Sequence, residues 1–115
     1  METKILTEEQ FRDLSKKLVT TIERGYKIIP LNTLQHPKYV LKRPVYITIE
    51  IEKNTVIASL GDIEAFAYAD TEYEAIDNLC KEIVNVFEDL KDEKENLGIL
   101  PGKWLDFLEE VIEQR

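Results

Sequence analysis

The stretch Ala65-Phe-Ala-Tyr-Ala-Asp-Thr-Glu-Tyr-Glu-Ala-Ile-Asp-Asn-Leu-Cys-Lys-Glu-Ile83 decides the fold, because a short strand runs directly into a long amphipathic helix. Within it, Thr71 and Glu74 stand three residues apart, which is the spacing of a capping box. In that motif the threonine hydroxyl accepts a hydrogen bond from the Glu74 amide, and the carboxylate reaches back to the cap amide. The sequence therefore predicts that Thr71 caps the start of the helix.

Apolar residues recur every three or four positions after Thr71, which is the period of one face of a helix. We expect the helix to run to about Lys94, and it needs a sheet to cover its apolar face. The predicted buried stripe is Ile76, Leu79, Cys80, Ile83, Phe87 and Leu90, and the predicted solvent face is Asp77, Lys81, Asn85, Glu88 and Lys91.

The residues before the helix supply the sheet. Residues 45–52 alternate strictly, with Val45, Ile47, Ile49 and Ile51 on one face and Tyr46, Thr48, Glu50 and Glu52 on the other. A two-residue turn at Lys53-Asn54, with Asn54 in the left-handed conformation, leads into a returning strand over residues 55–60. After a turn at Gly61-Asp62, residues 63–69 form a third strand whose small alanines let the helix lie close. The result is a three-stranded antiparallel meander, to which Tyr39–Leu41 can add a fourth, edge strand.

Both flanks of this core carry helical patterns. Thr7 and Gln10 form a second capping box, and the apolar stripe that follows predicts a helix from about Glu8 to Arg24. Residues 26–30 resemble a short extended segment that Pro30 stops. Near the other end, apolar residues at helical spacing predict a last short helix from Lys103 to Glu113. These residues are Trp104, Leu105, Phe107, Leu108, Val111 and Ile112.

We therefore expect one α+β domain over residues 1–115, with a sheet packed by a long helix and flanked by N-terminal and C-terminal helices. Its parts are an N-terminal helix and extension (1–44), the sheet-plus-helix core (45–98) and a short C-terminal helix (99–115). The single Cys80 cannot form an internal disulfide, and no apolar run is long enough to span a membrane. The first residues lack the pattern of a signal peptide, so we expect a cytoplasmic protein.

The formal net charge of −8 disfavours nucleic acid as a partner and favours a basic protein. The strongest basic cluster, Lys38, Lys42 and Arg43, is too small for more than weak binding to phosphates. The alternative is that the acidic surface only keeps the protein soluble. Candidate contacts to a partner are Glu50 and Glu52, on the exposed face of their strand, and Trp104, if it is not part of the core.

The residue patterns predict no catalytic, metal-binding or cofactor-binding site. Cys80 lies on the apolar helix face, and His36 has neither a second histidine nor a cysteine to complete a metal site. Asp62, Glu64 and Asp70 cluster near the ends of the third strand, where they would form a paired-acid or cation site. Their simpler roles are a turn residue, an exposed residue and a charge at a helix N-terminus.

The order hairpin, third strand, helix, together with Asp70, Thr71, Glu74 and Ala75 at the helix start, resembles the HicB-like antitoxin family over about Val45 to Leu90. The chain departs from that family at Ala69, where members commonly carry glycine. The resemblance implies a protein without catalytic activity that binds and neutralises a small basic RNA-cleaving toxin. Many members add a DNA-binding module, but the 17 residues after Gly98 are too few for one, so DNA binding is not expected.

Two other kinds of function stay open. In the first, the protein is a homodimer or larger homo-oligomer with a structural or ligand-binding role, and the stripe of the N-terminal helix packs on its mate. In the second, it is a small enzyme that uses the acids at positions 62, 64 and 70. The segment 26–44 has no assigned role in either, and it lies outside the HicB-like core.

Overall fold

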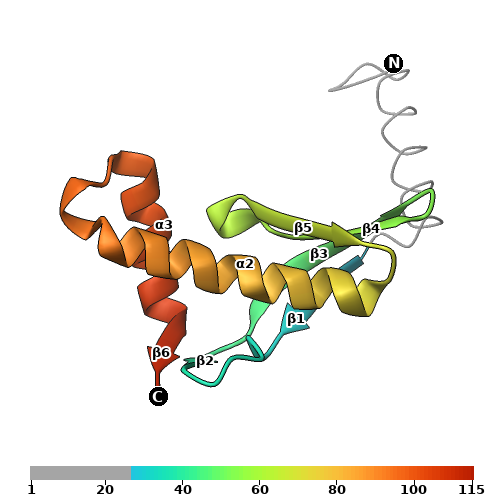
Figure 1. The fold of residues 1–115 in the computed structure, drawn as a ribbon, viewed down its shortest axis with the longest axis horizontal. Helices are drawn as coiled ribbons and strands as arrows, with labels where there is room; N and C mark the ends of the chain where they lie inside the picture. Colours follow the sequence, from blue (N-terminus) through green and yellow to red (C-terminus); the bar gives the residue numbers. More distant parts are fainter. Residues whose placement is uncertain (1–26) are drawn as a thin grey trace, which may run out of the picture.

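The computed structural model describes residues 27–115, so the helix predicted from about Glu8 to Arg24 lies outside the described residues. The described chain is an α+β fold with two antiparallel sheets and two α-helices, which confirms the predicted class (Figure 1). The elements are β1 (Lys27–Leu31), β2 (Tyr39–Leu41), β3 (Val45–Glu52), β4 (Thr55–Leu60), the 3₁₀ turn η1 (Gly61–Ile63), β5 (Ala65–Ala69), α2 (Glu72–Asp92), the 3₁₀ turn η2 (Lys94–Asn96), α3 (Ile99–Val111) and β6 (Ile112–Gln114).

The main sheet has the order β1-β3-β4-β5, and every neighbouring pair of strands is antiparallel. The meander predicted from the sequence is its β3-β4-β5 part. Glu52 pairs with Thr55, so the β3–β4 turn has the two residues expected. The left-handed conformation, however, falls on Lys53 (φ 57°) and not on Asn54, so this detail of the prediction is wrong.

The fourth strand of this sheet is β1, not the predicted Tyr39–Leu41. β1 pairs with β3 along its whole length, and Pro30 lies opposite Tyr46 inside the strand. A proline has no N–H to donate, but an edge strand needs pairing on one side only, so Pro30 does not interrupt the ladder. Tyr39–Leu41 is also a strand, but it pairs with β6 in a separate two-stranded sheet.

The third strand of the meander starts two residues later than predicted. Residues 61–63 form the turn η1, and Glu64 closes it in the left-handed conformation (φ 54°, ψ 35°). Ile63 is therefore a buried turn residue that lies next to α3, not a strand residue. Ala65, Ala67 and Ala69 face α2, as their small size predicts.

The helix α2 begins after Thr71, as the capping box predicts. The Glu74 amide donates to the Thr71 hydroxyl at 3.1 Å. The same hydroxyl donates to the Glu74 carboxylate at 3.0 Å. The carboxylate thus binds the side chain of the cap residue, whereas the capping box predicts a bond to its amide. The helix ends at Asp92, and η2 follows it over the residues that were predicted as a charged run.

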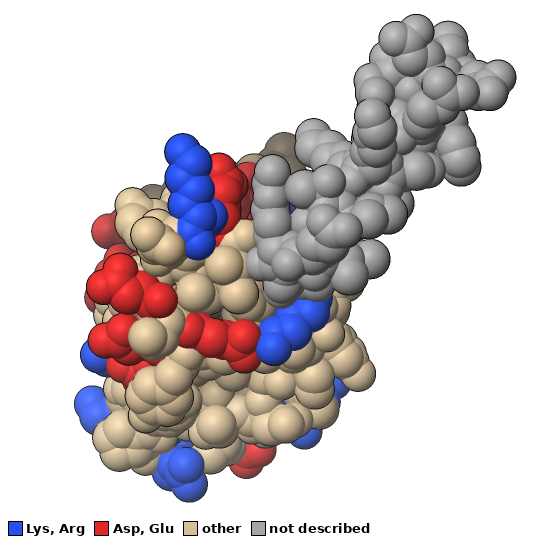
Figure 2. Space-filling view, turned by 90° about the vertical axis from the view of Figure 1, so that its right-hand side faces the viewer, with Lys and Arg blue, Asp and Glu red and all other residues tan. Residues whose placement is uncertain are grey.

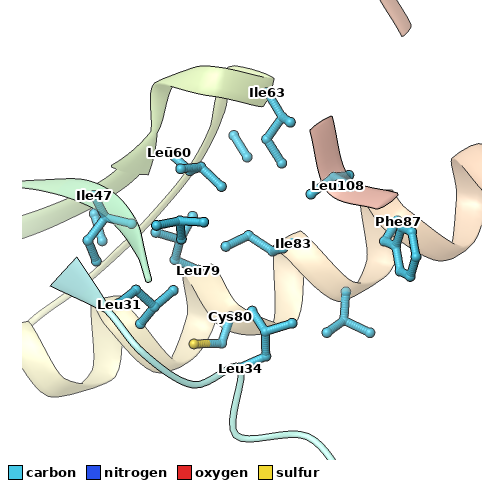
Figure 3. Close-up of a cluster of buried hydrophobic side chains, with 14 of the residues drawn as sticks. Leu31, Leu34, Ile47, Leu60, Ile63, Leu79, Cys80, Ile83, Phe87 and Leu108 are labelled. Carbon is cyan, nitrogen blue, oxygen red and sulfur yellow. The ribbon is translucent and has the colours of Figure 1, made fainter. Parts of the chain in front are cut away.

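The core lies between one face of the main sheet and α2, and α3 closes one end of it. Figure 3 shows Ile47 and Leu60 from the sheet directed toward Leu79 and Ile83 of α2. The predicted stripe is buried from Leu79 to Phe87, while Ile76 and Leu90 at its ends are half-buried. None of the helices that the structure describes is long and apolar enough to cross a membrane.

The last helix starts and ends earlier than predicted. Gly98 is the N-cap residue and has an extended backbone. Pro101 fits within the first turn of the helix, where the backbone N–H groups have no partner inside the helix. The helix ends at Val111, and Ile112 belongs to β6, where it pairs with Leu41. Two further backbone bonds fasten the small sheet at its ends: the Lys42 amide donates to the Val111 carbonyl, and the Arg115 amide donates to the Lys38 carbonyl, each at 2.8 Å.

Candidate functional site

The two faces of the main sheet differ in what covers them. α2 lies on one face, and large apolar side chains on the other are exposed to solvent. We call this second face the open face. Residues opposite each other in an antiparallel pair point to the same side of the sheet, so the register defines its members. They are Ile28 and Pro30 from β1, Tyr46, Thr48, Glu50 and Glu52 from β3, Thr55, Ile57 and Ser59 from β4, and Phe66 and Tyr68 from β5.

Four large hydrophobic side chains on the open face are about 60% exposed. They are Ile28 (62%), Tyr46 (64%), Phe66 (59%) and Tyr68 (62%). The rings of Phe66 and Tyr68 stack with 6.1 Å between their centroids. Single exposed hydrophobic residues are ordinary, but several on one sheet face are typical of a surface that contacts another molecule.

Glu50 and Glu52 lie on the open face, as the alternation of β3 predicts. Glu50 shares a cross-strand row with Ile57 and Tyr68, and Glu52 lies opposite Thr55. Both side chains are exposed, and within residues 27–115 no lysine or arginine forms an ion pair with either carboxylate. The open face therefore combines aromatic surface with negative charge.

A hollow of about 350 Å³ lies at the end of the open face nearest the β3–β4 turn, and we call it the hairpin hollow. Its lining is Glu52, Lys53, Thr55, Ile57 and Tyr68. It is a shallow, open depression and not an enclosed cavity. It thus has room for one side chain from a partner, and its volume is at the low end of the range for ligand pockets.

A second hollow, of about 480 Å³, lies on the other side of the same turn, beside the start of α2. Its lining is Ile51, Lys53, Asn54, Val56 and residues 70–72. Figure 2 views the molecule from this end and shows acidic side chains gathered on one side, with lysine and arginine side chains standing apart from each other. Lys53 lines both hollows, so it lies between them.

Trp104 does not join Glu50 and Glu52 in one surface. It belongs to α3, which packs on α2, and it is half-buried against the core. One turn earlier in the same helix, Ile99 (83% exposed) and Leu100 (49% exposed) are the exposed apolar residues. The structure therefore gives Trp104 mainly a packing role.

The three acids of the alternative paired-acid site are not brought together. Asp62 and Glu64 precede β5 and Asp70 follows it. The six residues from Glu64 to Asp70 span roughly 20 Å in an extended strand. Among the described residues, no group of three or more histidine, cysteine, aspartate or glutamate side chains is placed to hold a metal ion.

Cys80 is a packing residue in the described fold. It is 1% exposed, and its thiol donates a long hydrogen bond to the Thr33 carbonyl at 3.6 Å. Burial, with a smaller contribution from the nearby Asp77 charge, raises the pKa of the Cys80 thiol to about 11. The group is therefore a neutral thiol at physiological pH, whereas a nucleophilic cysteine is a thiolate.

His36 and the basic cluster form local contacts. His36 accepts a hydrogen bond from the Lys38 amide at 3.0 Å and lies beside the Tyr39 ring. Arg43 forms an ion pair with Glu110 at 3.0 Å, and the Lys42 ammonium lies 3.5 Å from the Glu109 carbonyl. Glu110 of α3 thus neutralises the charge of Arg43, which further weakens the cluster as a phosphate site.

The contribution of β1 to the open face is not among the features predicted from the sequence. The signal was present, because Ile28 and Pro30 alternate with Ile29 and Leu31 in the same way as the residues of β3. A proline is also typical of the end of an extended segment, so Pro30 obscures this alternation.

Comparison with known proteins finds no protein-family model, no curated protein and no solved structure that matches this chain. The resemblance to the HicB-like antitoxins thus stays a prediction.

Proposed function

We propose that this protein acts by binding a basic protein partner on the open face of its main sheet. The observation that carries the proposal is the set of four large hydrophobic side chains, each about 60% exposed, on the same face as Glu50 and Glu52. Burial of exposed apolar area supplies affinity, and acidic groups beside it select a partner of positive charge. The net charge of −8 attracts such a partner over longer distances.

The size of the face bears on the extent of the interface. Four strands of about six residues cover roughly 400 Å² in plane, from the usual strand spacing and rise per residue. One partner in a standard interface buries about 800 Å². A stable partner therefore extends beyond the open face, and the second hollow, on the other side of the β3–β4 turn, is an adjoining surface.

The partner that we propose is a small basic RNA-cleaving toxin, which the protein neutralises as an antitoxin. This step comes from the resemblance of residues 45–90 to the HicB-like family. It agrees with the charge of the open face, because a protein that binds RNA needs a basic surface, and an acidic partner is suited to cover that surface. Stacked aromatic rings such as Phe66 and Tyr68 also suit bases of single-stranded RNA, but Glu50 and Glu52 beside them repel phosphates.

The proposal predicts that a small basic protein is encoded next to this chain, and co-expression of the two tests it. We expect a stable complex that copurifies and relieves growth inhibition by the partner. The double variant Tyr46→Ser, Tyr68→Ser should lose the complex and keep its fold, because both side chains are exposed. Tyr73→Ser is the matched control, since Tyr73 is 73% exposed on α2, away from the open face, and should leave binding unchanged. Absence of such a neighbour, absence of any complex, or a complex that the double variant retains contradicts the proposal.

Self-association through the open face is a second candidate, because the same exposed hydrophobic residues suit a second copy of the chain. Two open faces in contact would place the Glu50 and Glu52 pairs of both copies in one interface, where like charges repel. The free protein is therefore expected to be monomeric through this face. Light scattering that shows a dimer, reduced to a monomer by Tyr46→Ser, would favour self-association instead.

A further inference from the structure

The hairpin hollow has one apolar side and one acidic side. Ile57 forms the apolar floor and Tyr68 stands beside it on the neighbouring strand, in the row that also contains Glu50. The next row toward the turn holds Glu52 opposite Thr55, and both line the hollow. We propose that this hollow binds the side chain of an arginine from the protein partner, an inference that rests on the proposed function.

The chemistry of the lining matches the two parts of an arginine side chain. The methylene groups of a long basic side chain favour apolar surface, which Ile57 and the Tyr68 ring provide. Its charged end favours a carboxylate, which Glu52 provides within the hollow and Glu50 provides beside it. The two parts of the lining thus lie in adjacent rows of the sheet, so one extended side chain can contact both.

Arginine fits this lining better than lysine. A planar guanidinium stacks on an aromatic ring and forms two parallel hydrogen bonds to one carboxylate, whereas an ammonium is a compact, strongly hydrated charge. Tyr68 and Glu52 line the same hollow from β5 and β3, so an arginine that crosses β4 has the ring at one side of the hollow and the carboxylate at the other.

Lys53 also lines the hollow and opposes a cation there. It lies at the turn between the two hollows, and the second hollow carries Asp70 and Glu72 in its lining. Glu72 already pairs with Lys27 at 3.0 Å, so Asp70 is the carboxylate toward which the long, flexible Lys53 side chain can turn when an arginine enters. Lys53 therefore reduces the affinity for arginine without blocking the hollow, so Lys53→Ala should strengthen binding.

Titration of the full chain with two capped tripeptides, followed by backbone amide chemical shifts, tests the inference. The first peptide is Ala-Arg-Ala, and the second carries citrulline, which keeps the shape of arginine and removes its charge. We expect the arginine peptide to shift the amides of Glu52, Thr55, Ile57 and Tyr68. The citrulline peptide should bind about five- to tenfold more weakly, because it loses an exposed ion pair and a cation–π contact.

Two variants sharpen the test. Glu52→Gln should weaken binding of the arginine peptide about two- to fivefold, the range for an exposed ion pair. Glu113→Gln removes an exposed acid from β6, outside the hollow, and should leave binding unchanged. Equal binding of the two peptides, no effect of Glu52→Gln, or shifts spread over the acidic surface would each overturn the inference.

The titration separates this inference from the proposed function. If the hollow binds the arginine peptide but no basic partner copurifies, the proposed function fails and the site stands. If a complex forms through the open face but the arginine peptide does not bind, the assignment of the hollow fails and the proposed function stands.

Discussion

The Thr71 hydroxyl forms two hydrogen bonds at the start of α2, one with the Glu74 amide and one with the Glu74 carboxylate. Thr71→Ala removes both and leaves a helix amide without its partner, so the free energy of unfolding should fall by about 1 kcal/mol. Thr71→Ser is the matched control, since serine keeps the hydroxyl and caps helices equally well. Urea unfolding of the three proteins measures the difference, and an alanine variant as stable as the parent would show that the cap adds nothing.

Cys80 makes the stability depend on pH in the alkaline range. Burial raises the pKa of its thiol from 9.0 to about 11, so the folded state holds a proton that the unfolded state releases. The stability that the protonated thiol adds to the folded state is fully present below pH 9 and is lost as the pH rises through about 11. The free energy of unfolding should therefore decline across this range, and the decline should be smaller in Cys80→Ala.

Tyr39 contributes in the same direction, and it needs its own control in that experiment. Burial and its hydrogen bond to Glu88 at 2.9 Å raise the pKa of the Tyr39 hydroxyl. Tyr39→Phe removes this second titration. The effect of Cys80→Ala is therefore best measured both in the parent protein and in the Tyr39→Phe variant. A decline of the same size with and without Cys80 would mean that the thiol is not the group that titrates.

At the scale of the elements, β6 is a structural part of the fold and not a frayed helix end. Ile112 is 4% exposed and pairs with Leu41, whereas its neighbour Glu113 is exposed. Ile112→Ala should therefore lower the free energy of unfolding by about 2–4 kcal/mol. Glu113→Ala in the same strand should change it by less than about 0.5 kcal/mol. Thermal unfolding compares the two, and equal small effects would show that β6 is not packed.

The elements also show which structure is predictable from the sequence. α2 and the β3–β4 hairpin were predicted because a capping box, strict alternation and a two-residue turn are local signals. The pairing partners of β1 and β2 are not predictable in this way. Which of these two short strands joins the main sheet depends on contacts with residues far along the chain, such as Ile112, which pairs with Leu41. Alternation alone predicts that Glu50 lies on the open face, whereas the position of Ile28 can be predicted only if the pairing of β1 with β3 is known.

At the scale of the whole molecule, the proposed complex should depend on ionic strength. A protein of net charge −8 and a basic partner attract each other, and salt screens that attraction. Between about 0.05 and about 0.5 M salt, the affinity should fall by about tenfold or more. Isothermal titration at the two salt concentrations measures the change.

The apolar part of the interface should respond differently from the charged part. Tyr68→Ser should weaken the complex by a similar factor at low and at high salt, because burial of an aromatic side chain is not screened. An affinity of the parent protein that does not change with salt would contradict a partner selected by charge.

The small β2–β6 sheet can form only after the last residues of the chain have been synthesised. Tyr39 and Gln114 pair across 75 positions of the chain, while the β3–β4 and β4–β5 hairpins join near neighbours. At a synthesis rate of about 5–20 residues per second, Gln114 is added roughly 4–15 s after Tyr39. Both hairpins can form well within that time. During that interval Leu41 lacks its pairing partner Ile112, so the nascent chain carries exposed apolar surface at this strand until β6 has been made.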